Sequence, residues 1–204
     1  MQIIIFDTEF TAWEGSAQRN WSLDWEHREI IQIAAVKVAL DSNCVQVISS
    51  FNTLVKPVVN PKLSDYIVQL TGIEQQVLDD MGIDFQDALS QLHAFCSQGT
   101  LPCYSWGNDK RVLLDNCLLS GVAMLDFNGG FHNLHRIARN AKLDGAHLCS
   151  GELASHLGLE LNGHIHNALY DVRSIALALQ QWVEKGALPA SLLQSNLQSK
   201  SAIH

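Results

Sequence analysis

The stretch Ile3–Glu9 reads Ile-Ile-Ile-Phe-Asp-Thr-Glu and places a short apolar run directly before two carboxylates. β-Branched and aromatic residues favour strands, so Ile3–Phe6 is predicted to form a buried strand. Side chains alternate along a strand, and residues two apart therefore point to the same side. Asp7 and Glu9 are thus expected to lie together at the carboxyl end of this strand.

Downstream of this start, the sequence predicts two more strands and then a mixture of helices and strands. The expected strands cover residues 29–40, 45–56 and 101–106, with a short one near Phe131. The expected helices cover residues 64–70, 84–96, 108–120, 134–141, 151–157 and 167–185, with another short one after Ile73. Residues 11–28, which carry three tryptophans, are expected to form a long loop with exposed aromatics. This order predicts one α/β domain over residues 1–204, with a mixed sheet, a core of about 2–185 and a tail or short helix at 186–204.

Composition bounds the class of protein. Of 204 residues, 47% are hydrophobic and 17% charged, which is enough apolar material for a core. The sequence shows neither an apolar run of membrane-spanning length nor a signal peptide, so we expect a cytoplasmic protein without membrane contact. The net charge of −8 argues against nucleic acid, although a site for divalent metals must itself be acidic. Five of the thirteen basic residues do fall between Lys110 and Lys142.

Three further residues are candidates for the same functional site as Asp7 and Glu9. Asp109 and Asp171 each fall near the start of a predicted helix, where an acid is also explained by the helix dipole. His166 taken alone is better explained as a surface histidine than as a catalytic one. Five residues along a helix rotate a side chain by roughly 500°, so His166 and Asp171 converge only if His166 lies on the preceding loop.

The five residues Asp7, Glu9, Asp109, His166 and Asp171 together indicate a metal-dependent hydrolase far more specifically than any one of them does alone. Close carboxylates repel one another, and a divalent cation between them offsets that cost; hard Mg²⁺ or Mn²⁺ suits such oxygen ligands. Two such ions can activate water and stabilise the leaving oxygen in phosphodiester hydrolysis. That chemistry needs about four carboxylates and one proton acceptor near neutral pH, a role that histidine fits.

Three segments of the chain carry a family resemblance. Phe6–Phe10 resembles the first motif of the DnaQ-like, or DEDDh, 3′–5′ exonucleases, and Trp106–Asp109 resembles their second motif. His166–Asp171 matches their third motif, His-x-Ala-x-x-Asp. Leu70–Ile73 is similar to a family segment that approaches the terminal nucleotide, and residues 58–65 look closest to the Eri-type and KapD-like branch.

The resemblance implies a ribonuclease-H-like fold and an enzyme that releases nucleoside 5′-monophosphates from 3′ ends. It implies that Asp7, Glu9 and Asp171 hold one metal, and that Asp7 and Asp109 serve a second. His166 would accept the proton of the attacking water. Thr8, Phe10 and the segment Leu70, Thr71, Gly72 and Ile73 would contact the substrate, a single-stranded RNA or DNA 3′ end.

The residues leave several alternatives open. Phe10 is equally explained by packing in the core or by stacking on the terminal base. A proofreading subunit docked on a polymerase would keep the same chemistry but requires a protein partner, which the sequence does not reveal. An inactive nucleic-acid-binding adaptor has no use for five intact site residues, and a metal-dependent phosphatase acting on small molecules would also suit the acidic charge.

Overall fold

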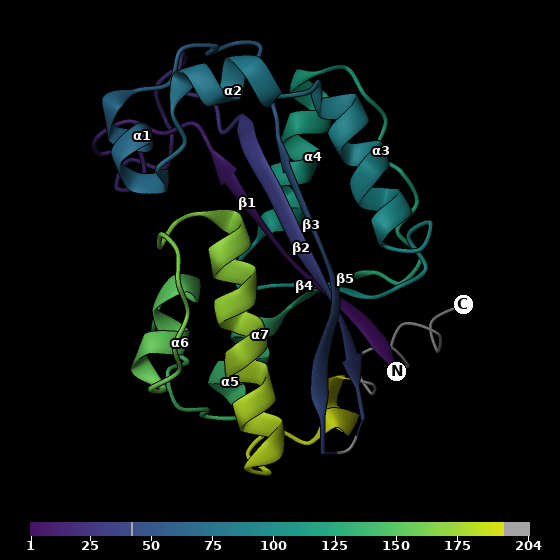
Figure 1. Cartoon of the computed structure of the whole chain (residues 1–204). Helices are drawn as coiled ribbons and strands as arrows, with labels where there is room; N and C mark the ends of the chain where they lie inside the picture. Colours follow the sequence, from purple (N-terminus) through teal and green to yellow (C-terminus); the bar gives the residue numbers. More distant parts are fainter. Residues whose placement is uncertain (42, 194–204) are drawn as a thin grey trace.

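The computed structural model describes residues 1–41 and 43–193 and contains a five-stranded sheet in the order β3-β2-β1-β4-β5 (Figure 1). β1 (Gln2–Phe10) pairs antiparallel with β2 (Ile30–Leu40), which pairs antiparallel with β3 (Val45–Leu54). β4 (Cys103–Ser105) lies parallel to β1, and β5 (Phe131–Asn133) lies parallel to β4. The predicted mixed sheet is therefore confirmed.

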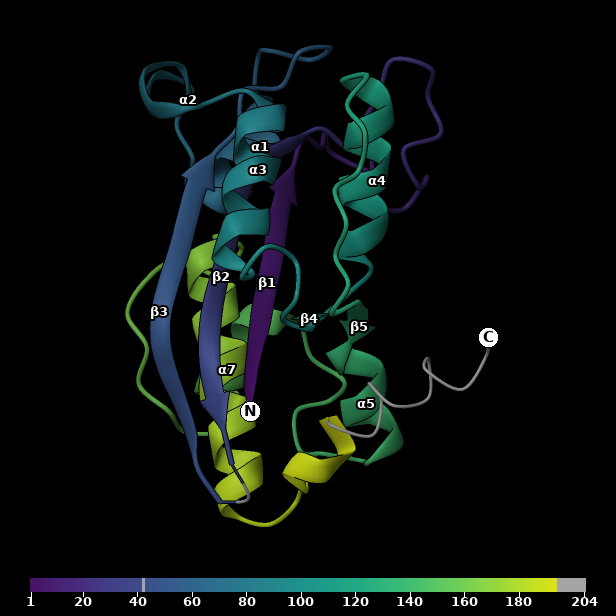
Figure 2. The same ribbon diagram turned by 90° about the vertical axis from the view of Figure 1, so that its right-hand side faces the viewer.

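Helices cover both faces of this sheet (Figures 1 and 2). They are α1 (Asp65–Thr71), α2 (Gln75–Met81), α3 (Phe85–Phe95), α4 (Asp109–Leu119), α5 (Leu134–Asn140), the 3₁₀ turn η1 (Ser150–Glu152), α6 (Leu153–His156) and α7 (Ala168–Glu184). The core on one face joins β1 and β2 to α5, α6 and α7, and the core on the other face joins them to α3 and α4. None of the helices in the described residues is long and apolar enough to cross a membrane.

Alternation along β1 explains why this strand lies at the centre. Ile3 and Ile5 pack toward α7, whereas Ile4 and Phe6 pack toward α3 and α4. All four side chains are essentially inaccessible to solvent, and each contributes roughly 1.5–3 kcal/mol of hydrophobic stabilisation. The same alternation turns Asp7 and Glu9 toward the α7 face.

Some predicted boundaries were wrong. β1 continues to Phe10, so Asp7 and Glu9 lie within the strand instead of after it, because pairing with β2 extends to that point. β4 is three residues long, shorter than predicted. Asn108 occupies the N-cap position of α4, but its side chain makes no capping hydrogen bond. The predicted helix from Gly151 begins instead as the 3₁₀ turn η1.

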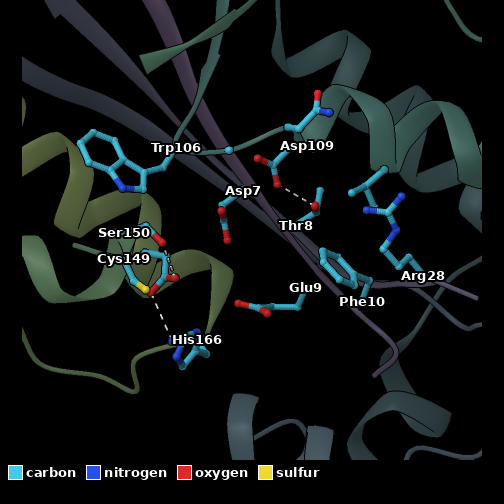
Figure 3. A pocket seen from close by; sticks show the side chains of 14 residues that line it. Asp7, Thr8, Glu9, Phe10, Arg28, Trp106, Asp109, Cys149, Ser150 and His166 are labelled. Atoms are coloured by element: carbon cyan, nitrogen blue, oxygen red, sulfur yellow. Dashed lines mark hydrogen bonds between the residues drawn. The ribbon is translucent and has the colours of Figure 1, made fainter. Parts of the chain in front are cut away.

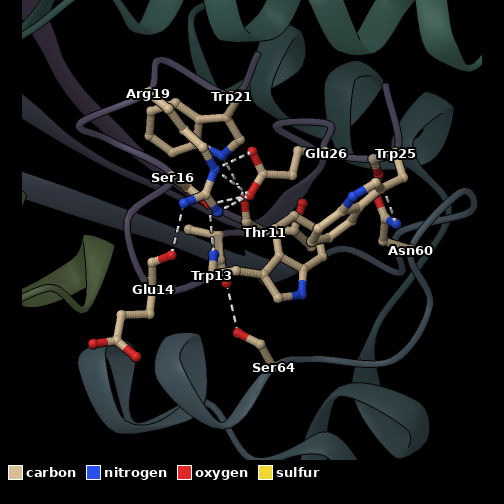
Figure 4. A network of polar contacts seen from close by, with 11 residues as sticks. Thr11, Trp13, Glu14, Ser16, Arg19, Trp21, Trp25, Glu26, Asn60 and Ser64 are labelled. Carbon is tan, nitrogen blue, oxygen red and sulfur yellow. Dashed lines mark hydrogen bonds and ion pairs between the residues drawn. The ribbon is translucent and has the colours of Figure 1, made fainter. Parts of the chain in front are cut away.

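The tryptophan-bearing segment 11–29 is more buried than predicted. A buried Glu26 accepts hydrogen bonds from Ser16 at 2.9 Å and from the guanidinium of Arg19 (Figure 4). Trp21 is half-buried against the core around α1, whereas Trp25 is 50% exposed. The ion pair between Arg19 and Glu26 joins two parts of this connection. The expectation of exposed aromatics holds for Trp25 but not for Trp13 and Trp21, which are half-buried.

The chain continues to pack on the core after α7. Leu188, Ala190 and Leu193 are buried, and the hydroxyl of Tyr104 in β4 donates to the carbonyl of Leu193 at 2.7 Å. Residues up to 193 therefore contribute to the core. The remainder of the predicted tail, residues 194–204, lies outside the described residues.

Candidate active site

Three carboxylates converge where β1 passes the start of α7. Asp7, Glu9 and Asp171 each offer an oxygen, and these atoms all lie within 4.8 Å of one another. Figure 3 shows Asp7 and Glu9 turned into one pocket with His166 beside them. Strand alternation aligns the first two residues, and Asp171 joins them from the first turn of α7.

Asp109 is the fourth carboxylate of the same pocket and is the first residue of α4. The hydroxyl of Thr8 donates to Asp109 Oδ1 at 2.8 Å, and both residues are buried. Thr8 points to the face of β1 opposite to Asp7 and Glu9, and its hydroxyl is occupied by Asp109. Its role in this structure is to orient a carboxylate, and the predicted contact with substrate stays a prediction.

The pocket is electrostatically unfavourable without a cation. Burial raises the pKa of Asp7 well above its usual range, and the neighbouring carboxylates of Asp109, Glu9 and Asp171 raise it further. Burial, followed by the charges of Asp171 and Asp109, raises the pKa of Glu9 in the same way. Burial also raises the pKa of Asp109 and Asp171, although hydrogen bonds from Thr8 and Ser150 respectively oppose the shift. Each of these shifts reports a carboxylate that is costly to ionise in the folded protein.

Asp171 is held by the loop before α6. Ser150 donates its hydroxyl to Asp171 Oδ2 at 2.8 Å. A Cβ at Gly151 would lie 2.6 Å from Asp171 Oδ1, so only glycine allows this close approach. The Ser150–Gly151 pair was not among the predicted site residues. It approaches Asp171 only through the packing of the η1–α6 segment on α7.

His166 lies in the turn before α7, as the sequence predicted. It adopts a left-handed backbone with φ 66°, which is uncommon for a residue other than glycine. Its backbone N–H donates to Asp171 Oδ1 at 3.3 Å, so the strained turn is tied to the carboxylate cluster. The turn brings the imidazole to the rim of the pocket that the carboxylates line.

A buried glutamine fixes the start of α7. Gln32 Oε1 in β2 accepts from the backbone N–H of Ala168 at 2.9 Å. Gln32 Nε2 donates to Asn52 at 2.9 Å and to Asn167, the N-cap of α7, at 3.3 Å. The sequence analysis missed Gln32, although a single polar residue within the apolar stretch Ile30–Val36 was a usable signal.

Phe10 closes one side of the pocket, whose volume is about 350 Å³. Its ring packs edge-on against Trp21 with ring centroids 5.5 Å apart, and it also touches the core around α3 and α4. Arg28 lines the same side and forms an ion pair with Asp115 at 3.0 Å. Phe10 therefore packs on the core and also faces the pocket, and its stacking on the terminal base stays a prediction.

The segment Leu70–Ile73 lies apart from the acidic pocket. Thr71 ends α1 instead of lying in a loop; it is fully buried, and its hydroxyl donates to the carbonyl of Ile67. Gly72 and Ile73 line a neighbouring hollow, and Gly72 has a left-handed backbone that packs close to the ring of His164. Gly72 thus packs beside His164, on the loop that also carries His166.

The donor set fits hard divalent cations. Its atoms are carboxylate oxygens, which Mg²⁺ and Mn²⁺ prefer, and the group contains no thiolate. The raised pKa values show a concentration of negative charge that the arginine lining the pocket does not neutralise, because Arg28 is paired with Asp115. A bound cation would offset this repulsion.

A mixed β-sheet that carries four carboxylates and a histidine in one pocket is the architecture of ribonuclease-H-like nucleases. The RNase_T family model, described as exonuclease, matches residues 4–179. The chain therefore belongs to this exonuclease family, and the family predicted from the three motifs is confirmed.

Known proteins with similar sequences carry exonuclease names. The 3′–5′ exonuclease Snipper of Drosophila melanogaster is 25% identical over 91% of this chain and 70% of its own length. ERI1 exoribonuclease 2 of Xenopus laevis is 36% identical over 91% of this chain, which spans only 29% of that protein. The solved nuclease domain of 3′hExo, a DEDDh family member bound to rAMP, superimposes with a TM-score of 0.74 at 22% identity, covering 91% of this chain and 93% of that one. This structural likeness confirms the ribonuclease-H-like fold.

Proposed function

We propose that this protein is a metal-dependent 3′–5′ exonuclease that releases nucleoside 5′-monophosphates from single-stranded RNA or DNA. The observation that carries the proposal is the convergence of Asp7, Glu9 and Asp171 within 4.8 Å. Among the described residues, no lysine or arginine forms an ion pair with these carboxylates. In a protein that only bound nucleic acid, such a cluster would lower the binding affinity, because carboxylates repel phosphates.

The chain's own residues would divide the chemistry as follows. Asp7, Glu9 and Asp171 would hold one divalent ion, and Asp7 and Asp109 would serve a second. Such ions, when bound, supply a nucleophilic water and stabilise the charge of the leaving oxygen. His166, on the rim of the pocket, would accept the proton of the attacking water. Phe10 would stack on the terminal base, and the backbone at Gly72 would approach the terminal sugar.

The reaction would break the phosphodiester bond nearest the 3′ end. Attack at phosphorus leaves the phosphate on the released nucleoside 5′-monophosphate and a hydroxyl on the shortened strand. Thr8 and Ser150 would keep the carboxylates of Asp109 and Asp171 oriented during this step, because each donates a hydrogen bond of 2.8 Å. Fixed orientation of ligands is a common requirement of metal-dependent catalysis.

Digestion of end-labelled single-stranded RNA and DNA of matched sequence tests the proposal. With Mg²⁺ or Mn²⁺, we expect a ladder shortened from the 3′ end and the release of mononucleotides. Excess EDTA should stop the reaction. Hydrolysis of a free mononucleotide with no attack on either strand would instead identify a small-molecule phosphatase. The RNA-to-DNA rate ratio would settle the substrate preference, which rests on contacts to the 2′-hydroxyl.

A further inference from the structure

A second hollow of about 420 Å³ is lined by Asn133, His135, Arg136, Arg139 and Asn140. Its lining includes two arginines and no carboxylate. Both arginines are exposed, and their spacing on α5 places them on one helix face. Within the part of the chain that the structure describes, neither forms an ion pair. In a chain of net charge −8, this uncompensated positive surface favours an anionic ligand.

Three other arginines form ion pairs. Arg28 and Arg111 share Asp115, at 3.0 and 2.7 Å respectively, and Arg19 pairs with Glu26. Each of these guanidinium groups therefore lies against a carboxylate. Arg136 and Arg139 form no ion pair within the described residues, and they differ from the likewise unpaired Arg173 because they line one hollow together.

The arginine hollow adjoins the acidic pocket through direct contacts. Asn133 Nδ2 donates to the carbonyl of Gly107 at 2.8 Å. The ring of His135 lies against that of Trp106, with centroids 5.0 Å apart. Gly107 and Trp106 both line the acidic pocket. The two hollows therefore share one wall, and a ligand that extends beyond the carboxylates on this side meets the arginines.

The direction of a bound strand follows from the arrangement of the pocket. In Figure 3, Asp7 lies between Phe10 on one side and Trp106 on the other. If Phe10 stacks on the terminal base, the scissile phosphate lies at Asp7, and a strand that continues in the same direction leaves on the side of Trp106. That is the side on which Asn133 and the two arginines lie.

We propose that Arg136 and Arg139 bind phosphates of the single strand upstream of the scissile bond. This assignment rests on the proposed exonuclease function and deepens it. It also explains how an acidic protein binds a polyanion. The carboxylates face only the phosphate that reacts, and the arginines that bind the upstream phosphates lie beyond the wall formed by Trp106 and Gly107.

The test compares three proteins on two substrates. The double variant Arg136→Gln/Arg139→Gln is set beside wild type and beside a charge-matched control, Lys37→Gln/Lys185→Gln, whose side chains lie outside both hollows. The substrates are a single-stranded 12-mer and the 4-nitrophenyl ester of thymidine 5′-monophosphate, which has no upstream phosphate. KM, kcat and thermal midpoint are measured with Mn²⁺ over a series of salt concentrations.

We expect the arginine variant to raise KM for the 12-mer by roughly 3- to 30-fold, the effect of losing two exposed ion pairs. Its kinetics on the nitrophenyl ester and its thermal midpoint should not change. The slope of log KM against log salt should fall by about 1.4, since each lost phosphate contact on a single strand removes about 0.7.

Two results would overturn the assignment. One is an unchanged KM and salt slope for the 12-mer in the arginine variant, especially if Arg28→Gln raises KM and lowers the slope. The other is an equal loss on the nitrophenyl ester, which would place the arginines at the reacting group or in the fold. Failure of wild type to degrade the 12-mer while it hydrolyses the ester would instead refute the exonuclease function itself.

Discussion

Replacing Gln32 with alanine should uncouple the start of α7 from the sheet. The change removes the acceptor of the Ala168 N–H and the donor to Asn52 and Asn167. Because Ala168 is fully buried, its N–H would be left without a partner. An unsatisfied buried donor costs roughly 1–3 kcal/mol, and with the lost hydrogen bonds the destabilisation should reach about 2–4 kcal/mol. For a chain of this size, that lowers the thermal midpoint by about 4–16 °C.

The same change should reduce catalysis. His166 and Asp171 flank the helix start that Gln32 holds, and a displacement of about 1 Å in a catalytic group can cost 10²-fold in rate. We therefore expect kcat to fall by up to about 10²-fold with little change in KM. Turnover is measured well below the midpoint, so that the variant is folded during the assay.

Asn52→Ala provides the matched control, because it removes one hydrogen bond of Gln32 while leaving the contact with Ala168 intact. Asn52 is exposed, so this variant should keep near-normal stability and turnover. Wild-type kcat in Gln32→Ala, accompanied by a lowered midpoint, would show that the glutamine stabilises the fold without positioning the site. An unchanged midpoint would refute the energetic argument as well.

Three further predictions concern the carboxylates and the histidine. Mn²⁺ should raise the thermal midpoint of wild type relative to EDTA, because a cation relieves repulsion among Asp7, Glu9 and Asp171; equal midpoints would contradict a metal site there. In the metal-free protein, the raised pKa values of Asp7 and Glu9 mean that the folded state favours the protonated carboxyls. The folding stability that these protonated groups contribute is therefore lost as pH rises from the usual carboxyl range through the raised pKa values. Asp7→Asn should abolish turnover. In melts across pH 5–8, the thermal midpoint of Asp7→Asn should rise relative to that of wild type as pH rises, and a difference in midpoint that stays constant or shrinks would count against the assignment. His166→Ala should lower turnover by about 10²–10⁴-fold while metal still raises its midpoint, whereas loss of that metal effect would make His166 a ligand.

The sequence predicted the parts of the site that depend on local geometry. Strand periodicity placed Asp7 and Glu9 on one side, and helix periodicity required His166 to lie before α7. Both hold because they depend on residues adjacent in the chain. Asp109 and Asp171 joined the set through the chemistry of four carboxylates and the family resemblance, since neither stood out alone.

The remaining features depend on contacts between distant segments. Thr8 orients Asp109 only because α4 begins beside β1, and Ser150 reaches Asp171 only because η1 packs on α7. Trp21 is half-buried because its ring packs on Phe10 and its indole N–H donates to the carbonyl of Thr11, contacts that no periodicity encodes. The expected single domain over residues 1–204 and the cytoplasmic location stay predictions.

The carboxylate cluster draws its members from opposite ends of the chain, Asp7 from the first strand and Asp171 from the last long helix. Proteins emerge from the ribosome amino end first, so β1 is made long before α7. A nascent chain therefore carries Asp7 and Glu9 but lacks His166 and Asp171 until the segment that forms α7 has been made. A chain that stops before α7 has only two of the three clustered carboxylates and cannot complete the cluster.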